Sequence, residues 1–366
     1  MSLIDPAVNR WTSVCSSADG TKLATVSLNT YYNSGGLFRS QDSGITWSQQ
    51  ERGLPDLISW YSVSCSADGS KLAAVGSMGV FISSTSGDYW SNQNVGLEGV
   101  MPKGSPWPGT STIAMSADGM MIAVGVYRQS LYISKDGGAS FALVYKTPDT
   151  WFTSGYWKSM AISAAGTNLV AVYSSDTGAQ TKAYLVTSSD SGGSWQVCTS
   201  GLPVSSTGSD FTYKSVASSA DGSHLILVAS AAGRSRSVYV SRDGGVTWAV
   251  KSIKVLLNGA ETVFPQGFVS VAISASGSNA VALSTSYGVF LSSDGGDSWT
   301  QPSDSQVNMQ IGKVNPLAFS GVSISADGAK IAVAVFGDMI YVSNDAGKTW
   351  SKSVTSDPLI YVIDQI

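Results

Sequence analysis

An eight-residue pattern, Ser-x-Asp-x-Gly-x-Thr/Ser-Trp, returns along the chain and constrains its fold more than any other feature. Intact copies occupy 40–47, 188–195, 241–248, 292–299 and 343–350. Two further copies are altered: 83–90 has Thr85 in place of Asp, and 134–141 ends in Phe141. The spacing between closing aromatics runs from 43 residues (Trp47 to Trp90) to 54 (Phe141 to Trp195). A regular period of this size indicates a repeat architecture, so we expect one domain over residues 1–366.

The residues of the pattern are those of a turn that forms its hydrogen bonds within itself. The Asp carboxylate accepts from backbone N–H groups, Gly supplies a positive φ, and the hydroxyls bond locally. The closing Trp then fills the space beneath the turn. A calcium loop is the functional alternative, but a cation needs several more oxygen ligands than one Asp supplies. We therefore predict no metal site and no cofactor.

A second marker precedes each turn pattern and also occurs seven times. A β-rich strand runs into Ser-Ala-Asp-Gly or a variant of it, and another apolar strand follows at once. Asp-Gly between alternating strands is a strong hairpin signal. The hairpin turns stand at 19–20, 68–69, 118–119, 165–166, 221–222, 276–277 and 327–328.

Each unit therefore supplies four short antiparallel strands, which at this period is typical of a propeller blade. We predict an all-β, seven-bladed β-propeller. The expected blades are 11–56, 57–106, 107–153, 154–208, 209–263, 264–314 and 315–358. The leftover termini, 1–10 and 359–366, are expected to pack together where the ring closes.

The turn pattern resembles the Asp-box, or BNR, repeat, and the match recurs along nearly the whole chain. The resemblance implies a β-propeller in which each box forms the turn between the third and fourth strands. Sialidases carry such boxes, but their Arg-Ile-Pro motif is absent here. Arg39 and Arg242 stand beside boxes, on the face opposite to the expected substrate site. The resemblance therefore assigns no catalytic residue.

Function is expected on the face opposite to the boxes, where the connections vary in length and composition. Aromatic residues crowd these loops, and a second set, Trp11, Trp60, Trp157, Tyr213, Phe268 and Phe319, begins the innermost strands in register. The regularity of this second set favours packing between blades. The alternative is that exposed ring edges stack on sugars. The predicted ligand contacts are Tyr31, Tyr32, Trp60, Trp107, Arg128, Trp151, Tyr156, Trp157, Tyr213 and Tyr287.

Composition excludes some classes of function. With a net charge of -4 the chain has no basic stripe, which argues against a nucleic-acid partner. The sequence contains no run of eighteen uncharged apolar residues, so it predicts no membrane span. The N-terminus shows no signal-peptide pattern, and the low charge favours an extracellular location only weakly. Three cysteines are an odd set, so we expect no disulfide framework, with Cys15 and Cys65 as buried small hydrophobes.

Catalytic signals are sparse. His224 is the only histidine, and its place after a hairpin turn predicts a strand surface residue. We therefore predict a non-catalytic binding module for carbohydrate or a glycoconjugate. A glycoside hydrolase or polysaccharide lyase is one alternative, and a protein-interaction scaffold is the other. The enzyme would draw on loop carboxylates among Glu51, Asp56, Glu98, Asp149, Asp176, Asp210, Glu261, Asp304 and Asp338.

Overall fold

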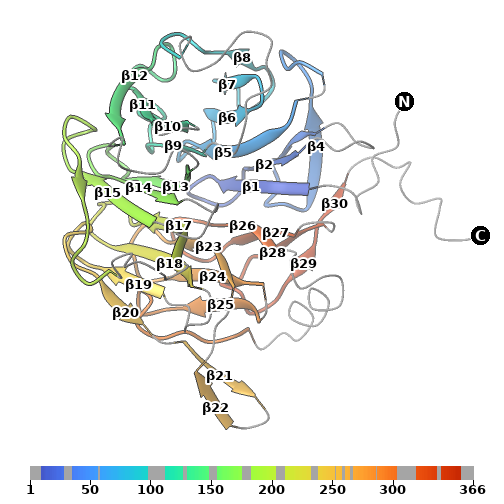
Figure 1. The fold of residues 1–366 in the computed structure, drawn as a ribbon. Helices are drawn as coiled ribbons and strands as arrows, with labels where there is room; N and C mark the ends of the chain where they lie inside the picture. The colour runs from blue at the N-terminus through green and yellow to red at the C-terminus, as the bar shows by residue number, and fades with distance from the viewer. Residues whose placement is uncertain are drawn as a thin grey trace, which may run out of the picture.

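A computed structural model describes most of the chain as strands and tight turns, with no helix among the described residues. The colours in Figure 1 run once around a ring of sheets, so that the first and last blades are neighbours. Seven blades are present, which confirms the predicted all-β propeller. The described residues are 10–28, 35–56, 58–97, 112–126, 130–147, 155–174, 183–202, 211–231, 238–251, 253–257, 260–263, 267–285, 287–302, 319–335 and 339–355.

The first four blades each contain four antiparallel strands in chain order, from the axis to the rim. Blade one is β1 (Arg10–Ser16), β2 (Leu23–Leu28), β3 (Leu37–Ser40) and β4 (Thr46–Gln50). Blade two is β5 (Trp60–Cys65), β6 (Leu72–Gly76), β7 (Gly79–Ser83) and β8 (Ser91–Asn92). Blade three is β9 (Thr112–Met115), β10 (Ile122–Val126), β11 (Ser130–Ser134) and β12 (Ala142–Lys146). Blade four is β13 (Tyr156–Ile162), β14 (Leu169–Ser174), β15 (Ala183–Ser188) and β16 (Gln196–Val197).

The last three blades follow the same order with two departures. In blade six the fourth strand is reduced to a bridge between Leu291 and Thr300. A separate hairpin, β21 (Lys254–Leu257) with β22 (Ala260–Val263), projects from the ring after blade five (Figure 1). Blade five is β17 (Phe211–Ser218), β18 (Leu225–Ala231), β19 (Val238–Ser241) and β20 (Ala249–Lys251); blade six is β23 (Phe268–Ile273), β24 (Ala280–Ser284) and β25 (Gly288–Ser292); blade seven is β26 (Phe319–Ile324), β27 (Ile331–Val335), β28 (Ile340–Ser343) and β29 (Ser351–Lys352).

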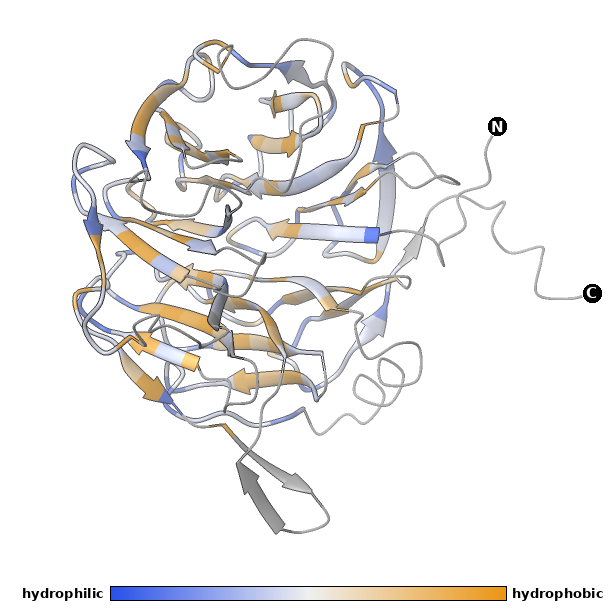
Figure 2. Cartoon of the chain, viewed as in Figure 1, coloured by the Kyte–Doolittle hydropathy of each residue, from blue (hydrophilic) through white to orange (hydrophobic). Residues whose placement is uncertain are grey.

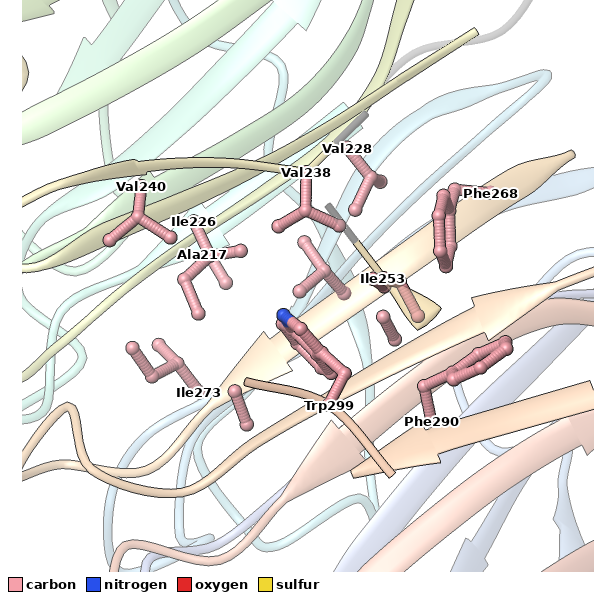
Figure 3. Close-up of a cluster of buried hydrophobic side chains, with 13 residues drawn as sticks. Ala217, Ile226, Val228, Val238, Val240, Ile253, Phe268, Ile273, Phe290 and Trp299 are labelled. Carbon is pink, nitrogen blue, oxygen red and sulfur yellow. The ribbon is translucent and has the colours of Figure 1, made fainter. Parts of the chain in front are cut away.

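The hydrophobic core lies between blades. The second strands are buried on both faces because each is covered by a neighbouring blade on either side, and they accordingly read as continuous apolar runs. Apolar residues follow the strands while polar residues collect at the turns (Figure 2). Between blades five and six, Trp299 lies among Ile226, Val238 and Ile253 (Figure 3).

Six of the seven first strands share an irregularity close to their N-terminal ends, and the described part of β9 in blade three does not have it. A register shift follows the leading aromatic residue, for example between Trp157 and Ser159, so one residue per strand is left as a β-bulge. The serine after the bulge bonds the next blade: Ser159 Oγ lies 3.3 Å from the carbonyl oxygen of Val216 and accepts from its N–H at 3.2 Å. Equivalent shifts occur in β1, β5, β17, β23 and β26.

A closed ring of backbone hydrogen bonds joins all seven blades at the hairpin face. The alanine before each hairpin turn donates its N–H to the carbonyl oxygen of the same alanine in the next blade. The N···O distances lie between 2.7 and 3.0 Å. The members are Ala18, Ala67, Ala117, Ala164, Ala220, Ala275 and Ala326, and the last bonds to the first.

In several blades the segment that follows the box contacts the box of the next blade at the rim, and the same kind of contact closes the ring between blades seven and one. After blade one, Arg52 accepts from the N–H of Trp90 at 3.0 Å, and Ser200 and Trp248 repeat this link at 3.2 Å. After blade seven, β30 (Val354–Thr355) pairs in parallel with β4 and places Thr355 opposite Trp47. Thr355 follows its box Trp by five residues, as Arg52 does. Of the predicted closing segments, 1–10 and 359–366, Arg10 is described at the start of β1 and the other residues lie outside the described ranges; the predicted blade boundaries stay predictions.

The interpretation of Cys15 and Cys65 as two separate buried hydrophobes is wrong. They form a disulfide between β1 and β5, with Cα atoms 6.0 Å apart. The first strands of neighbouring blades run side by side, which brings residues 50 positions apart into contact. An odd cysteine count did not exclude one pair, since Cys198 is left as the free thiol.

Candidate functional site

One face of the ring is occupied by the boxes and the hairpin turns, as predicted from the strand order. In every blade a box N–H donates to a hairpin-turn carbonyl, as Ser191 does to Thr167 at 2.9 Å. Within the box of blade four, Ser194 N and Ser188 Oγ both donate to Asp190 Oδ1 at 2.8 Å. The carboxylate therefore accepts its hydrogen bonds from within its own turn.

Acid should destabilise the protein through these carboxylates. Hydroxyl donors, followed by backbone N–H groups, lower the pKa of Asp19, Asp136, Asp190, Asp221 and Asp345 from 3.8 to about 2. Since the unfolded chain binds these protons at higher pH, the stabilisation is complete above about pH 4 and is lost as pH falls towards 2. Thermal melting between about pH 5 and 2 checks this; a flat melting temperature across that range would contradict it.

His224 is not the strand surface residue that its position predicted. Its side chain is buried between blades five and six, where Nε2 lies 2.9 Å from the carbonyl oxygen of Gly295. Burial lowers the pKa of the imidazole. Arg39 and Arg242 do lie beside boxes, paired with Asp88 and Asp297 of the next blade. Each of these ion pairs links two neighbouring blades on the box face.

A cavity of about 680 Å³ runs along the propeller axis, enclosed by the first strand of every blade. Those strands begin at the blade-to-blade connections and end at the hairpin face. The lining runs from Thr12, Lys158 and Lys214 at the connection end to Ser16 and Ser218 at the hairpin end, and the connection end, on the face where the sequence places the variable loops, is called the mouth below. The cavity wall contains many hydroxyl groups, including those of Thr12, Ser64 and Ser323.

The bulge residues of the first strands supply the most distinctive side chains of this cavity. Tyr61, Lys158 and Lys214 line it from blades two, four and five, and each is half-buried. Tyr156 lies two residues before Lys158 on the same strand, and the Nζ atom of Lys158 stands 3.7 Å from the centre of the Tyr156 ring. Burial raises the pKa of the Tyr61 phenol. Phenol rings, ammonium groups and hydroxyls thus meet at the mouth.

Three predicted ligand contacts belong to the core instead. Trp60 and Trp157 are 1% exposed and Tyr213 is 2% exposed. The ring of Trp157 packs edge-on against Tyr173, and that of Trp60 against Phe81, in both cases with centroids 5.3 Å apart. These residues therefore pack between blades, as the regularity of the register favoured. No ring face is left exposed to a sugar.

The other predicted contacts divide into described and undescribed positions. Tyr156 lines the cavity, and its role as a ligand contact stays a prediction. Tyr287 packs against the core between blades five and six, away from the cavity wall. The remaining candidates lie outside the described residues: Tyr31, Tyr32, Trp107, Arg128 and Trp151.

Sequence reasoning missed Tyr61, Lys158 and Lys214, although a signal was present. Each directly follows the aromatic residue that opens its strand, in Trp60-Tyr61, Trp157-Lys158 and Tyr213-Lys214. The buried positions around them are three residues apart, as for Trp60 and Val63. A regular strand returns to the same face after two residues, so this odd spacing indicates a bulge.

The described cavity wall offers no acid–base pair of carboxylates. It contains no Asp or Glu, and the carboxyls with shifted pKa values lie in boxes and hairpin turns or, for Asp297, in an ion pair with Arg242. Within the described ranges no group of three His, Cys, Asp or Glu side chains could hold a metal ion. Of the loop carboxylates that an enzyme would use, Glu51 and Asp56 have described side chains.

Comparison with known proteins agrees with this geometry. A sequence profile of the BNR/Asp-box repeat matches residues 341–352, which contain the box of blade seven. The chain is a seven-bladed β-propeller whose turns are similar to the Asp-box repeat. A search of curated protein sequences found no significant match.

Solved propellers share the fold at low sequence identity. YCF48 bound to D1 peptide is 17% identical, with a TM-score of 0.59 over 94% of this chain and 95% of that one. Hydrazine synthase of Kuenenia stuttgartiensis is 13% identical, with a TM-score of 0.62 over 95% and 98%. The GH74 xyloglucanase of Xanthomonas campestris is 15% identical, with a TM-score of 0.50 over 93% of this chain. The chain spans 66% of that xyloglucanase.

Propellers similar to this chain therefore include one solved with a peptide and one named for cleaving a polysaccharide. At these identities the likeness shows the fold alone. No helix in the described ranges has the length and apolarity to cross a membrane.

Proposed function

We propose that this propeller is a carbohydrate-binding module whose ligand enters the axial cavity from the loop face. The observation that carries the proposal is the cavity mouth itself, where Tyr61 and Tyr156 line a wall rich in hydroxyls. Saccharides are bound by such combinations, because an aromatic ring covers the apolar face of a sugar while hydroxyls and amides meet its edge.

Binding without catalysis is favoured by the chemistry of the described wall. An inverting or retaining glycosidase needs two carboxyl groups flanking the scissile bond, whereas the charged side chains of the described wall are both lysines. A glycoside hydrolase or lyase would have to draw its acid and base from the loops around the mouth. Release of reducing ends from a bound polysaccharide would establish that alternative.

A protein-interaction scaffold is favoured less. Large apolar side chains that are exposed, such as Met78, Leu143 and Val246, come from blades two, three and five rather than from one blade. The loop aromatics Tyr31, Tyr32, Trp107 and Trp151, together with Arg128, stay in the proposal as predicted contacts around the mouth.

Replacing Tyr156 by alanine should weaken glycan binding about tenfold, the effect of losing a contact of about 1.4 kcal/mol. A glycan array with labelled protein identifies the ligand, and titration of wild type and variant measures the loss. Tyr89→Ala is the matched control, because Tyr89 is exposed in a box on the opposite face. Absence of binding to every glycan by folded wild-type protein would overturn the proposed function.

A further inference from the structure

The first strands of six blades form the same bulge, but the residue at the bulge differs in chemistry from blade to blade; the described part of β9 in blade three has a regular register. The register shift isolates one residue each time, and the occupants are neutral in four blades: Thr12, Tyr61, Val269 and Ser320. In blades four and five the occupants are Lys158 and Lys214. Nothing in the packing of a blade demands lysine here, since four other blades form the same bulge without it.

The two lysines occupy the same side of the cavity mouth. Their strands are neighbours, joined by the hydrogen bonds between Ser159 and Val216 one and two residues further on. Lys158 is also held against the ring of Tyr156, a cation–π contact that restricts where its ammonium group can lie. The pair is therefore a localised positive site on the wall of an enclosed cavity.

The local charge opposes that of the whole protein. The chain carries a net charge of -4, yet the described wall has two cations and no carboxylate. Low-dielectric walls concentrate such a field within a cavity, so the described part of the wall favours anions in an otherwise acidic molecule.

We propose that Lys158 and Lys214 bind a carboxylate of the ligand, and that the saccharide recognised is an acidic one containing uronic acid residues. This inference rests on the proposed function. The ring of a uronate would stack on Tyr156 or Tyr61, and its carboxylate would accept hydrogen bonds from the two ammonium groups. Two neighbouring ammonium groups suit the single carboxylate of a uronate. The surrounding hydroxyls of the wall can hydrogen-bond to the hydroxyl groups on the edge of the sugar ring.

Calorimetric titration of the intact protein with tetragalacturonate and with its methyl ester tests the inference. The ester keeps the shape of the saccharide and removes its charge. We expect the free acid to bind and the ester to bind at least tenfold more weakly, with affinity for the acid falling as salt rises. Lys214→Met should weaken binding of the acid about tenfold, and Lys214→Arg should restore most of it.

Lys135→Met is the control for a change of net charge, because Lys135 is exposed in the box of blade three on the opposite face. Equal binding of acid and ester would overturn the inference while leaving the carbohydrate function in place. Binding of a peptide through its terminal carboxylate, with no binding of the acidic saccharide, would also overturn it. Failure of every glycan on the array would instead remove the function on which it rests.

Discussion

Trp90→Ala is expected to lower the free energy of unfolding by about 3–5 kcal/mol, the cost of removing a buried tryptophan. Trp90 is 0% exposed, its Nε1 donates to Gly87 O at 3.1 Å, and its backbone N–H forms the link to Arg52 of the preceding blade. The substitution leaves a cavity beneath the box and an unpaired carbonyl. It therefore weakens the turn and the packing of blade two against blade one, while the backbone link to Arg52 is kept because alanine retains the N–H.

The neighbouring Tyr89 provides the matched control for this change. It belongs to the same box and is 55% exposed, so Tyr89→Ala should change stability by no more than about 0.5 kcal/mol. Denaturant unfolding of both variants gives the comparison. If Trp90→Ala is no more destabilising than Tyr89→Ala, the box tryptophan is not the anchor that its burial indicates.

Loss of the disulfide between Cys15 and Cys65 is expected to lower the free energy of unfolding by about 2–5 kcal/mol, because the bond closes a long loop in the unfolded chain. The double variant Cys15→Ala/Cys65→Ala should melt at a lower temperature than wild type and should no longer respond to dithiothreitol. Cys198→Ala is the control, since Cys198 is the free thiol.

Thiol titration of the denatured, unreduced protein decides whether the bond forms. We expect one reactive thiol per chain, that of Cys198. Three thiols, together with a melting temperature that dithiothreitol does not change, would contradict the bond. Because disulfides persist in oxidising compartments, we expect the protein to function in one.

The repetitive part of the fold could be predicted from the sequence because each signal is local. A box or an Asp-Gly hairpin closes its own hydrogen bonds within a few residues, as Asp190 does with Ser188 and Ser194. Seven copies of both markers then fix the number of blades and the face on which the turns lie. Distant parts of the chain were not needed for that inference.

Features that depend on neighbouring blades were harder to predict. The disulfide joins two strands that the ring places side by side, and the burial of His224 depends on the turn glycine of blade six, Gly277, against which its ring packs. The projecting hairpin β21–β22 did have a local signal, since Asn258-Gly259 separates its strands.

The candidate site was predicted only in part for a similar reason. The aromatic register was visible, but its members are buried against neighbouring blades, whereas Tyr156, one residue before Trp157, is a half-buried ring on the cavity wall. The bulge moves the next residue into the wall, so the site is formed by positions beside the register. Two of those positions carry the lysines.

A crystal structure of the protein with a glycan selected by the array tests the central claim most directly. We expect the sugar to lie at the mouth of the axial cavity, against Tyr156 and beside Lys158 and Lys214. A sugar bound at the rim or among the boxes, with the cavity mouth unoccupied, would contradict the proposal that the axial cavity is the binding site.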